Sequence, residues 1–482
     1  MRGQFEYKGL PTCPVQVTSQ VGEAASSARN SNNNAWYVNT NNGNRNNNNT
    51  NNNNRVVGAS ELISNCDEWM DAESSAYKNK HHNFDAARVH YHLPELYALA
   101  HEVRDGVYYP RPMSAFILTY PVFREAFAPD HIDCIVHHYI APLFNAVADG
   151  VHAANGDISH GNRIGHSAHG MAERIREDIA SFNGDSVHMH RDISGFFMNI
   201  NREKAYELVE ELSHKYYGKP DRDEKLSLLY ITLTSDPLRG VKLRSLRSAW
   251  RHIAANKTLF NARPGYGLPI GKYPSQVVAG IYLSKVDGIL ATMPGIKAQH
   301  FVDDYDITAD TAREAHAAVE AIRPMLDELG LRLHPTKISI QPSRNGLLSC
   351  GRVVKGDRIY ISNRSVRSCK ARIIFSERSE EGAKALCRSI NSFFGLMAHC
   401  SAYNIQLRLA KLVKDGFGEW LYFREEPNHL ICVVRKRYTP QREAEAEIVK
   451  LINKIYNETG KAYQRNHRPR RSGGRHGGRR AA

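Results

Sequence analysis

The sequence predicts an α+β fold, because strand-like and helix-like segments follow one another without a regular repeat. Ser186 to Ile193 (SVHMHRDI) alternates in polarity like a strand. Arg202 to Tyr217 has helical spacing, with Glu and Lys on its exposed side. After Ser376 the apolar spacing is helical, which indicates a separate small lobe. The 482 residues suffice for roughly two or three domains.

Further elements are expected between Tyr217 and Ser376. Ser275 to Leu290 (SQVVAGIYLSKVDGIL) predicts a largely apolar helix that starts after a Gly/Pro-rich loop. Thr311 to Leu329 predicts another helix, which Gly330 ends. Short strands are expected around Ile338 and Ile359.

The segment His300 to Ile307 (HFVDDYDI) places two adjacent carboxylates, Asp303 and Asp304, between alternating apolar residues. This pattern predicts a tight β-hairpin. Neighbouring carboxylates repel each other, and a divalent cation relieves the repulsion because hard cations such as Mg²⁺ prefer oxygen ligands. An Asp-Asp pair also occurs on ordinary solvated turns, so the rest of the chain must decide between the two interpretations.

The chain is basic, with a formal net charge of +14, which predicts a polyanionic partner. Half of that charge lies between Arg465 and Arg480, a stretch with seven arginines and no acid. An Arg/Gly-rich segment cannot bury a core, so residues 461–482 are predicted to be a disordered extension that binds RNA. A solubilising tail without further function is the alternative.

Residues 1–58 are predicted to be a disordered low-complexity segment, because residues 30–54 are almost all Asn. A folded region is expected to begin near Ala59. No apolar run reaches the roughly 20 residues of a membrane span, and the N-terminus has no apolar secretory core. The eight cysteines are scattered without a Cys-x-x-Cys pair, which predicts reduced thiols. We therefore expect a cytoplasmic protein without membrane contact.

Asp192 ends the strand-like segment and is followed by a turn and two aromatic residues, which resembles the first metal-binding motif of the polymerase palm. It belongs to a series of blocks that occur in the order found in reverse transcriptases, over roughly residues 110–421. The blocks are PVFREAFAPDHIDCIVHHYI, SHGNRIGHSAHGMAERI, RDISGFF, GYGLPIGKYPSQVVAGIYL, HFVDDYDI, GLRLHPTKISIQ, GLLSCGRVV and INSFFGLMAHCSAY. The sequence departs from the family at the primer-grip turn, where it has Ser-Cys-Gly instead of Phe-Leu-Gly.

The resemblance implies a right-hand polymerase with fingers, palm and thumb. It places N-terminal helices and fingers in residues 59–185, a palm with the catalytic carboxylates in residues 186–362 and a helical thumb in residues 363–460. The implied activity is RNA-directed DNA synthesis from deoxynucleoside triphosphates by a two-metal mechanism.

The resemblance also implies the roles of the acidic residues. Asp192 and Asp303 would be the main metal ligands, Asp304 would assist, and the backbone carbonyl of Ile193 would complete a metal shell. The implied cofactor is Mg²⁺, with Mn²⁺ as an alternative.

Several residues fall where the family binds the nucleotide. Phe197 corresponds to a bulky ring that collides with a ribose 2′-hydroxyl, although Phe196 could exchange roles with it or either ring could serve only in core packing. Arg124 and Arg163 lie in the finger blocks and would clamp the triphosphate. Lys337 corresponds to a basic residue near the pyrophosphate, a candidate general acid. A solvated surface position is the alternative for each basic residue.

The segment from Ile270 to Gln276 (IGKYPSQ) discriminates within the family. Many bacterial reverse transcriptases carry Gln-Gly followed three residues later by Ser-Pro, whereas this chain has Ile-Gly and Ser-Gln at the matching positions. An aliphatic residue before Gly271 and a Gln after Ser275 resemble the enzymes of diversity-generating retroelements, which copy an RNA repeat with errors at adenines. Ile270 and Gln276 would lie against the template base and the incoming nucleotide, where loss of a polar contact would loosen selection. A neutral lineage substitution is the alternative.

The implied partners are a structured template RNA, its cDNA product, deoxynucleotides and a small basic accessory protein. A retron or abortive-infection defence enzyme would share the same palm. An RNA-binding scaffold with a decayed active site is a non-enzymatic alternative, against which the intact Asp192, Asp303 and Asp304 argue. The Asn-rich segment is either derived from a template or variable repeat, a simple linker, or a folded recognition domain.

Overall fold

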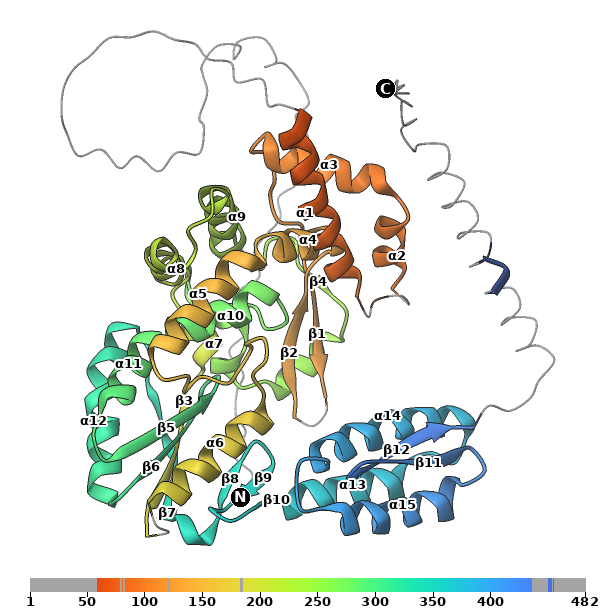
Figure 1. Cartoon of the computed structure of the whole chain (residues 1–482). Helices are drawn as coiled ribbons and strands as arrows, with labels where there is room; N and C mark the ends of the chain where they lie inside the picture. The colour runs from red at the N-terminus through yellow and green to blue at the C-terminus, as the bar shows by residue number, and fades with distance from the viewer. Residues whose placement is uncertain are drawn as a thin grey trace, which may run out of the picture. The chain divides into compact units, whose positions relative to one another are not determined.

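The computed structural model describes residues 59–78, 80, 83–119, 122–182, 185–435, 450–452 and 454. The segments predicted to be disordered, residues 1–58 and 461–482, lie outside these described residues. Helices and mainly antiparallel strands alternate along the chain, which confirms the predicted mixture of helix and sheet (Figure 1). The chain divides into two compact units.

The first unit is helical and discontinuous, because it combines residues up to Arg111 with Asp130–Ile140 and Asp223–Thr232. Trp69 and Tyr139 stack with their ring centroids 4.1 Å apart. The Nζ of Lys225 lies over the Tyr139 ring, 5.0 Å from its centroid, so a cation–π contact adds a third segment to the stack. The helices are α1 (Ala59–Tyr77), α2 (Phe84–His90), α3 (Leu93–Arg104), α4 (His131–Tyr139) and most of α9 (Arg222–Thr234).

The second unit contains a small three-stranded sheet near its start in the sequence. Strands β1 (Ser114–Leu118) and β2 (Arg124–Ala128) form an antiparallel hairpin, and β4 (Lys242–Leu243) pairs with β1 in parallel. Its inner face joins a cluster around Phe127 and Leu259. The nearby helices of the unit are α5 (Ala141–Ala154), α7 (Phe196–Asn199), α8 (Arg202–Tyr216) and α10 (Tyr273–Tyr282).

A four-stranded antiparallel sheet forms the centre of the second unit, in the order β5-β6-β3-β7. Strand β3 (Val187–Ile193) confirms the strand predicted there. Strands β5 (Ile296–Phe301) and β6 (Asp304–Ala309) confirm the predicted tight hairpin. Strand β7 (Leu333–Pro342) is longer than the short strand expected around Ile338 because it follows β3 over nearly its whole length.

Each face of this sheet has its own cover (Figure 1). Helices α11 (Ser284–Thr292) and α12 (Ala312–Glu328) lie on one face. The other face meets α6 (Ala168–Ser181), because Gln299 of β5 donates a 2.7 Å hydrogen bond to Asp178. Met189, Tyr305 and Ile307 are buried on the first face, together with His300. The second face carries the acidic and histidine side chains of β3 and β6, namely His188, His190, Asp192, Asp304 and Asp306.

Of the two helices predicted in this region, one needs correction. The single helix predicted for Ser275 to Leu290 is two helices, α10 and α11, separated at Leu283. The backbone N–H of Leu283 bonds to the carbonyl of Gly280, three residues back, which tightens the helix and ends it. The helix predicted for Thr311 to Leu329 is confirmed as α12, with Thr311 and Glu314 forming a capping box.

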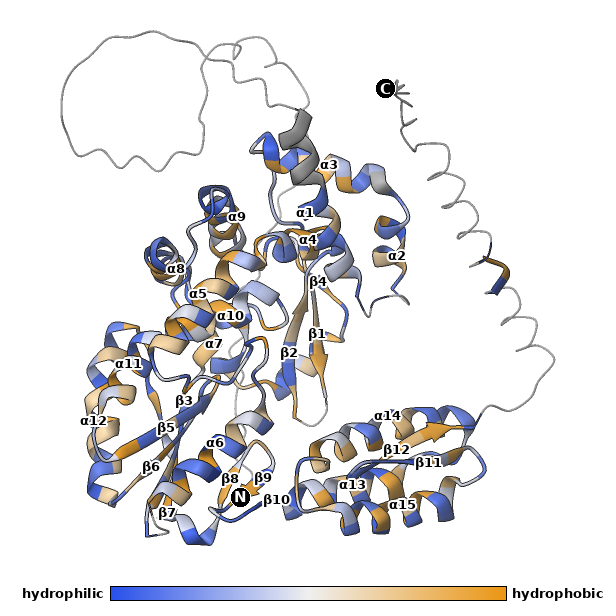
Figure 2. Ribbon diagram, in the orientation of Figure 1, coloured by the Kyte–Doolittle hydropathy of each residue, from blue (hydrophilic) through white to orange (hydrophobic). Residues whose placement is uncertain are grey.

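The C-terminal lobe is not purely helical, contrary to the prediction. Helices α13 (Asn363–Phe375), α14 (Glu380–Met397) and α15 (Tyr403–Phe417) pack with a hairpin of β11 (Leu421–Glu426) and β12 (His429–Val434). Figure 2 shows that β12 is strongly hydrophobic, and its alternate residues are buried against the helices. Three short strands precede this lobe, β8 (Leu347–Ser349), β9 (Arg352–Val354) and β10 (Ile359–Ile361). No helix in the described part of the chain has the length and apolarity that crossing a membrane requires.

Candidate active site

The three predicted metal-ligand carboxylates converge at one end of the central sheet. Asp192 of β3 lies directly opposite Asp304 of β6 in the strand register. Asp303 occupies the β5–β6 turn, and its carbonyl accepts a 3.1 Å hydrogen bond from the backbone N–H of Ile193. Tertiary structure therefore brings together residues that are more than a hundred positions apart in the sequence.

The turn that carries Asp303 has an unusual backbone. Val302 has φ of 63°, a left-handed conformation that β-branched residues rarely adopt. A Cβ on Gly161 would lie 2.6 Å from Val302 Cγ2 and 2.8 Å from its backbone nitrogen, so only glycine lets this neighbouring loop approach. Strained backbone of this kind persists where surrounding contacts determine it, and it is frequent at functional sites.

The carboxylates repel one another, and their protonation reflects it. Burial and then the charge of Asp192 raise the pKa of Asp303. Burial and then the charge of Asp303 raise the pKa of Asp304 to about 6. Lys337 donates a 2.8 Å hydrogen bond to Asp192, so one cation already neutralises part of the cluster. The site attracts positive charge, as a cation-binding site must.

A row of polar side chains continues from the carboxylates along the same face of the sheet. His190 donates from Nδ1 to Asp306 at 2.8 Å, and its Nε2 lies 3.7 Å from Asp304. His188 lies 3.2 Å from the same oxygen of Asp306. These residues were missed in the sequence, although the alternation of HMHRD and DYDIT places their polar side chains on one face of a strand.

A buried network supports the turn from the opposite side. Asp287 of α11 is fully buried and accepts hydrogen bonds from His300 at 3.1 Å and from the Tyr305 hydroxyl at 2.9 Å. The other ring nitrogen of His300 donates to the carbonyl of Val302 at 3.0 Å. Burial lowers the pKa of His300, but the charge of Asp287 outweighs it and the net shift is upward. The network thus ties the strained residue to the helix, and sequence reasoning did not identify Asp287.

Residues 158–161 add a short bridge along the edge of β5. His160 donates its backbone N–H to the carbonyl of His300, and His300 donates to the carbonyl of Ile158. The side chain of His160 bonds to Gln299 at 2.8 Å. Burial lowers the pKa of His160 to about 4, so the ring is neutral in the folded protein.

The predicted phosphate-binding residues lie in different environments. Arg163 is only 5% exposed and pairs with Asp157 at 3.0 Å, so its guanidinium is already engaged. Lys337 bonds to Asp192 and remains 45% exposed. Arg124 lies at the exposed start of β2. None of these positions contradicts the predicted role, which stays a prediction.

The structure brings two of the predicted nucleotide-binding residues, Phe197 and Ile270, into one hydrophobic cluster. Both are partly buried and pack against the cluster that contains Met198 and Phe127. Phe196 is 2% exposed and belongs to the core, so Phe197 is the ring of this pair that retains exposure. Gln276 lies part-exposed on α10, where its carbonyl accepts a 3.4 Å hydrogen bond from Asn162.

Gly271 is required by its backbone as well as by its neighbours. Its φ of 109° is unfavourable for other residues, and a Cβ there would lie 2.3 Å from the carbonyl oxygen of Phe127. The preceding carbonyl, that of Ile270, accepts a 2.8 Å hydrogen bond from Phe127 N–H. The IGKYPSQ loop is therefore fastened to the β1–β2 hairpin.

The carboxylate oxygens of the site are suitable ligands for a hard cation, but the side chains are not arranged around a common ion position. Carboxylate oxygens at the end of a sheet are the ligands Mg²⁺ prefers. In the described part of the chain, however, no group of three or more His, Cys, Asp or Glu side chains is arranged to hold an ion. The Mg²⁺ site therefore stays a prediction.

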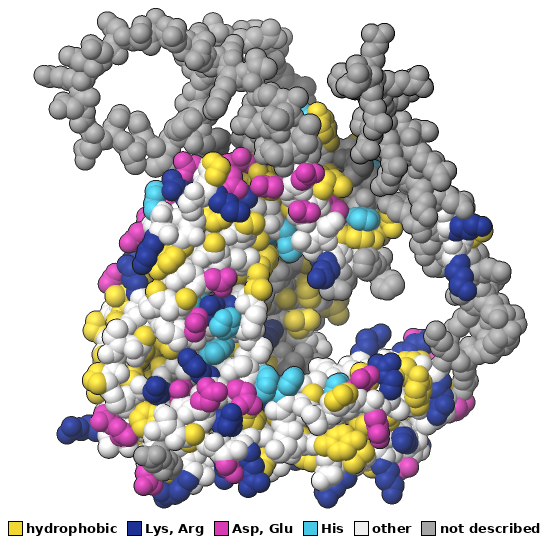
Figure 3. Space-filling view, viewed as in Figure 1, with side chains coloured by type: hydrophobic (Ala, Val, Ile, Leu, Met, Phe, Trp, Pro, Cys, Tyr) yellow, Lys and Arg dark blue, Asp and Glu magenta, His cyan; other side chains and the backbone are white. Residues whose placement is uncertain are grey.

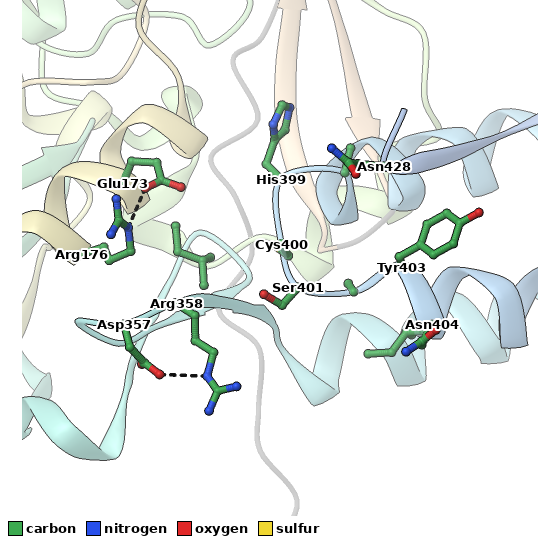
Figure 4. A pocket seen from close by; sticks show the side chains of 14 residues that line it. Glu173, Arg176, Asp357, Arg358, His399, Cys400, Ser401, Tyr403, Asn404 and Asn428 are labelled. Carbon is green, nitrogen blue, oxygen red and sulfur yellow. Dashed lines mark hydrogen bonds and ion pairs between the residues drawn. The ribbon is translucent and has the colours of Figure 1, made fainter. Parts of the chain in front are cut away.

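A separate cavity of about 660 Å³ lies among α6, the β9–β10 turn and the α14–α15 loop (Figure 4). Its charged lining residues form internal pairs, Glu173 with Arg176 at 2.7 Å and Asp357 with Arg358 at 3.0 Å. His399 beside it stacks on His169 with centroids 4.1 Å apart. Because these charges compensate each other, the cavity is a weaker catalytic candidate than the carboxylate cluster.

No protein-family model and no curated protein match the sequence. Solved structures with a similar backbone include the apo telomerase of Candida tropicalis, with a TM-score of 0.40 at 11% identity over 64% of this chain and 58% of that chain. The same telomerase truncated from its C-terminal domain gives 0.40 at 10% identity over 52% and 55%. The telomerase of Candida albicans in complex with a TWJ fragment of telomeric RNA gives 0.36 at 10% identity over 64% and 59%. The chain thus spans less than two thirds of each, and similarity of this degree assigns it to no family.

Replacing Gly271 with alanine should destabilise the protein by at least about 2 kcal/mol, because the backbone is strained and the Phe127 carbonyl must move. Gly165→Ala is the matched control, since Gly165 also has a positive φ of 80° but has nothing within 4 Å of the added carbon. Chemical denaturation of both variants measures the difference. Equal losses would show that the close approach to Phe127 carries no energy.

Replacing His160 with glutamine should change how stability depends on pH. The native state holds His160 neutral, whereas the unfolded chain binds a proton below its ordinary pKa of about 6.5, so this contribution is complete above that pH and is lost as pH falls. The stability advantage of the wild type over His160→Gln should shrink by about 2 kcal/mol between pH 7 and pH 5. His316→Gln, on the exposed side of α12, is the control for removing a histidine that the fold leaves exposed. A constant difference for His160→Gln would mean that the folded protein does not suppress its protonation.

Proposed function

We propose that this chain is an RNA-directed DNA polymerase. The observation that carries the proposal is the convergence of Asp192, Asp303 and Asp304 at one end of an antiparallel sheet. Segments far apart in the sequence contribute these residues, and the motif order resembles that of reverse transcriptases. Phosphoryl transfer depends mainly on positioning and charge stabilisation, which a carboxylate cluster of this kind supplies together with divalent cations.

Mg²⁺ bound by Asp192, Asp303 and Asp304 would lower the pKa of a primer 3′-hydroxyl and neutralise charge on the phosphates. The protein's own part in the reaction is to hold the carboxylates in place. Burial and the His300 network keep the Asp303 turn in its strained conformation. Lys337 and His190 balance negative charge on Asp192 and Asp304. The right-hand arrangement of fingers, palm and thumb is part of the same proposal.

A nucleic-acid partner is supported by basic surfaces outside the carboxylate cluster. Helix α13 carries Arg364, Arg367, Lys370 and Arg372 as exposed residues and contains no acid. Figure 3 shows Lys and Arg side chains at many places on the C-terminal lobe. Neutralising phosphates with such residues releases condensed counterions and favours binding. We propose a structured RNA as the template and its cDNA as the product.

We further propose that the enzyme belongs to a diversity-generating retroelement. The support is Ile270, which offers an apolar side chain in the Phe127 cluster where related enzymes have glutamine. A small basic accessory protein would be a further partner. Phe197, the part-exposed ring of its pair, would exclude ribonucleotides. A retron or antiphage defence enzyme is the alternative, and it would copy its template without errors concentrated at adenines.

Asp303→Ala should reduce primer extension by roughly 10²–10³-fold while leaving RNA affinity unchanged, because losing a metal-ligand carboxylate removes several kcal/mol of charge stabilisation. Asp310→Ala, which changes an exposed carboxylate just beyond β6, is the control and should remain active. Primer extension and filter binding on one RNA measure both quantities. Retained synthesis in Asp303→Ala would refute the metal assignment. A wild-type protein that binds RNA but never extends a primer would favour the scaffold interpretation.

Ile270→Gln should lower misincorporation at template adenines by roughly tenfold, because a polar contact discriminates more strongly than apolar shape. Sequencing cDNA made by the wild type and the variant from one RNA measures the error at each base. Ile374→Gln changes an exposed isoleucine of α13 in the C-terminal lobe and serves as control. Faithful copying of adenines by the wild type would remove the support for a diversifying enzyme.

A further inference from the structure

Residues 237–286 contain nine Lys and Arg and not one acidic residue. This acid-free run follows Asp236 and ends before Asp287. Its first half includes β4 and three short 3₁₀ turns, η1 (Arg247–His252), η2 (Ala255–Lys257) and η3 (Leu259–Asn261). The basic side chains are therefore held on an ordered segment of the described chain.

Glu125 anchors this segment to the β1–β2 hairpin. Its side chain is 2% exposed, and it accepts hydrogen bonds from Trp250 Nε1 at 2.7 Å and from the Thr258 hydroxyl at 2.8 Å. The backbone N–H of Leu259 donates a third bond at 2.6 Å. Three donors fix this carboxylate firmly, because losing any one of them would leave the buried negative charge of Glu125 with fewer hydrogen bonds.

The segment also approaches the carboxylate site closely. Gly195 lies three residues after Asp192, and a Cβ there would be 2.7 Å from the carbonyl oxygen of Asn256. The same turn includes Ile193, whose N–H bonds to the carbonyl of Asp303. Lys257, the residue after Asn256, is therefore positioned beside the carboxylate cluster. Consistent with this placement, the charge of Lys257 acts to lower the pKa of Asp303, although burial and Asp192 raise it overall.

Lys257 differs from the basic residues identified in the sequence. Arg163 is buried and paired with Asp157, and Lys337 is bonded to Asp192. The side chain of Lys257 is exposed, and among the described residues no hydrogen bond or ion pair engages its ammonium group. It is thus available to a ligand at the same site.

We propose that Lys257 binds the phosphate groups of the incoming nucleoside triphosphate, and that Glu125 positions it for that role. The proposal rests on the proposed polymerase function, which it extends by assigning a substrate contact. An ammonium group is a compact point charge that suits a flexible triphosphate. Because the segment is anchored by three hydrogen bonds to Glu125 and lies close to Gly195, the charge is presented without first ordering a loop.

The test compares Lys257→Gln with Lys257→Arg and with Lys285→Gln, an exposed lysine of α11 in the same acid-free run. Primer extension on one RNA template gives kcat and KM for dATP. Equilibrium dialysis with dATP and Mg²⁺ gives triphosphate affinity without polymerisation, and filter binding gives RNA affinity. We expect Lys257→Gln to raise both KM and the dissociation constant for dATP about tenfold with unchanged RNA affinity, as for loss of one charge-assisted hydrogen bond. Lys257→Arg should restore most of the loss, and Lys285→Gln should match the wild type.

The outcomes separate this inference from the proposed function. If the wild type polymerises but Lys257→Gln has the wild-type KM and dissociation constant for dATP, the inference fails and the polymerase proposal stands. If the wild type binds dATP without polymerising it, and Lys257→Gln alone among the variants weakens that binding, the phosphate contact stands and the polymerase proposal fails. A loss of RNA affinity with unchanged dATP binding would assign Lys257 to the nucleic-acid backbone and overturn the inference.

Discussion

Repulsion among three carboxylates is the constraint around which the second unit is organised. Asp192 and Asp304 face each other across β3 and β6, and Asp303 occupies the adjoining turn. Like charges directly opposite in a sheet destabilise it. Lys337 is bonded to Asp192, and His190, whose pKa is raised mainly by its hydrogen bond to Asp306, lies beside Asp304. A site that needs such compensation is preorganised for positive charge.

The turn itself is held by contacts from more than one direction. The Asp287–His300 pair reaches the carbonyl of Val302 from the α11 side, while Gly161 packs against the same residue from the neighbouring loop. Each contact involves groups that are costly to leave unpaired or that allow no extra atom. Several independent restraints can maintain a left-handed valine that its own preferences disfavour. The left-handed conformation of Val302 is therefore maintained by contacts from other elements and not by the turn alone.

The same logic extends from the sheet to the β1–β2 hairpin. Gly271 fastens the IGKYPSQ loop to Phe127, and Glu125, two residues earlier, fastens the acid-free segment. Both contacts start from one short strand. Through Phe127 and Glu125, strand β2 contacts both the hydrophobic cluster of Phe197 and Ile270 and the basic segment that includes Lys257. A single hairpin supports both the base-facing side and the phosphate-facing side of the proposed nucleotide site.

The sequence by itself determined the α+β class, β3, the tight β5–β6 hairpin and α12, because polarity period, turn residues and a capping box are local signals. It also singled out Asp192, Asp303 and Asp304 through motif order. It predicted one helix where α10 and α11 are separated at Leu283, and it missed the β11–β12 hairpin because helical spacing before it dominated the pattern. Only the tertiary structure decided that Asp287 supports the turn, that Phe196 is core while Phe197 is part-exposed, and that Lys257 lies beside Asp303. The physical reason is that these roles depend on which side chains, distant in the sequence, become neighbours in the folded chain, and no local period in the sequence records such neighbours.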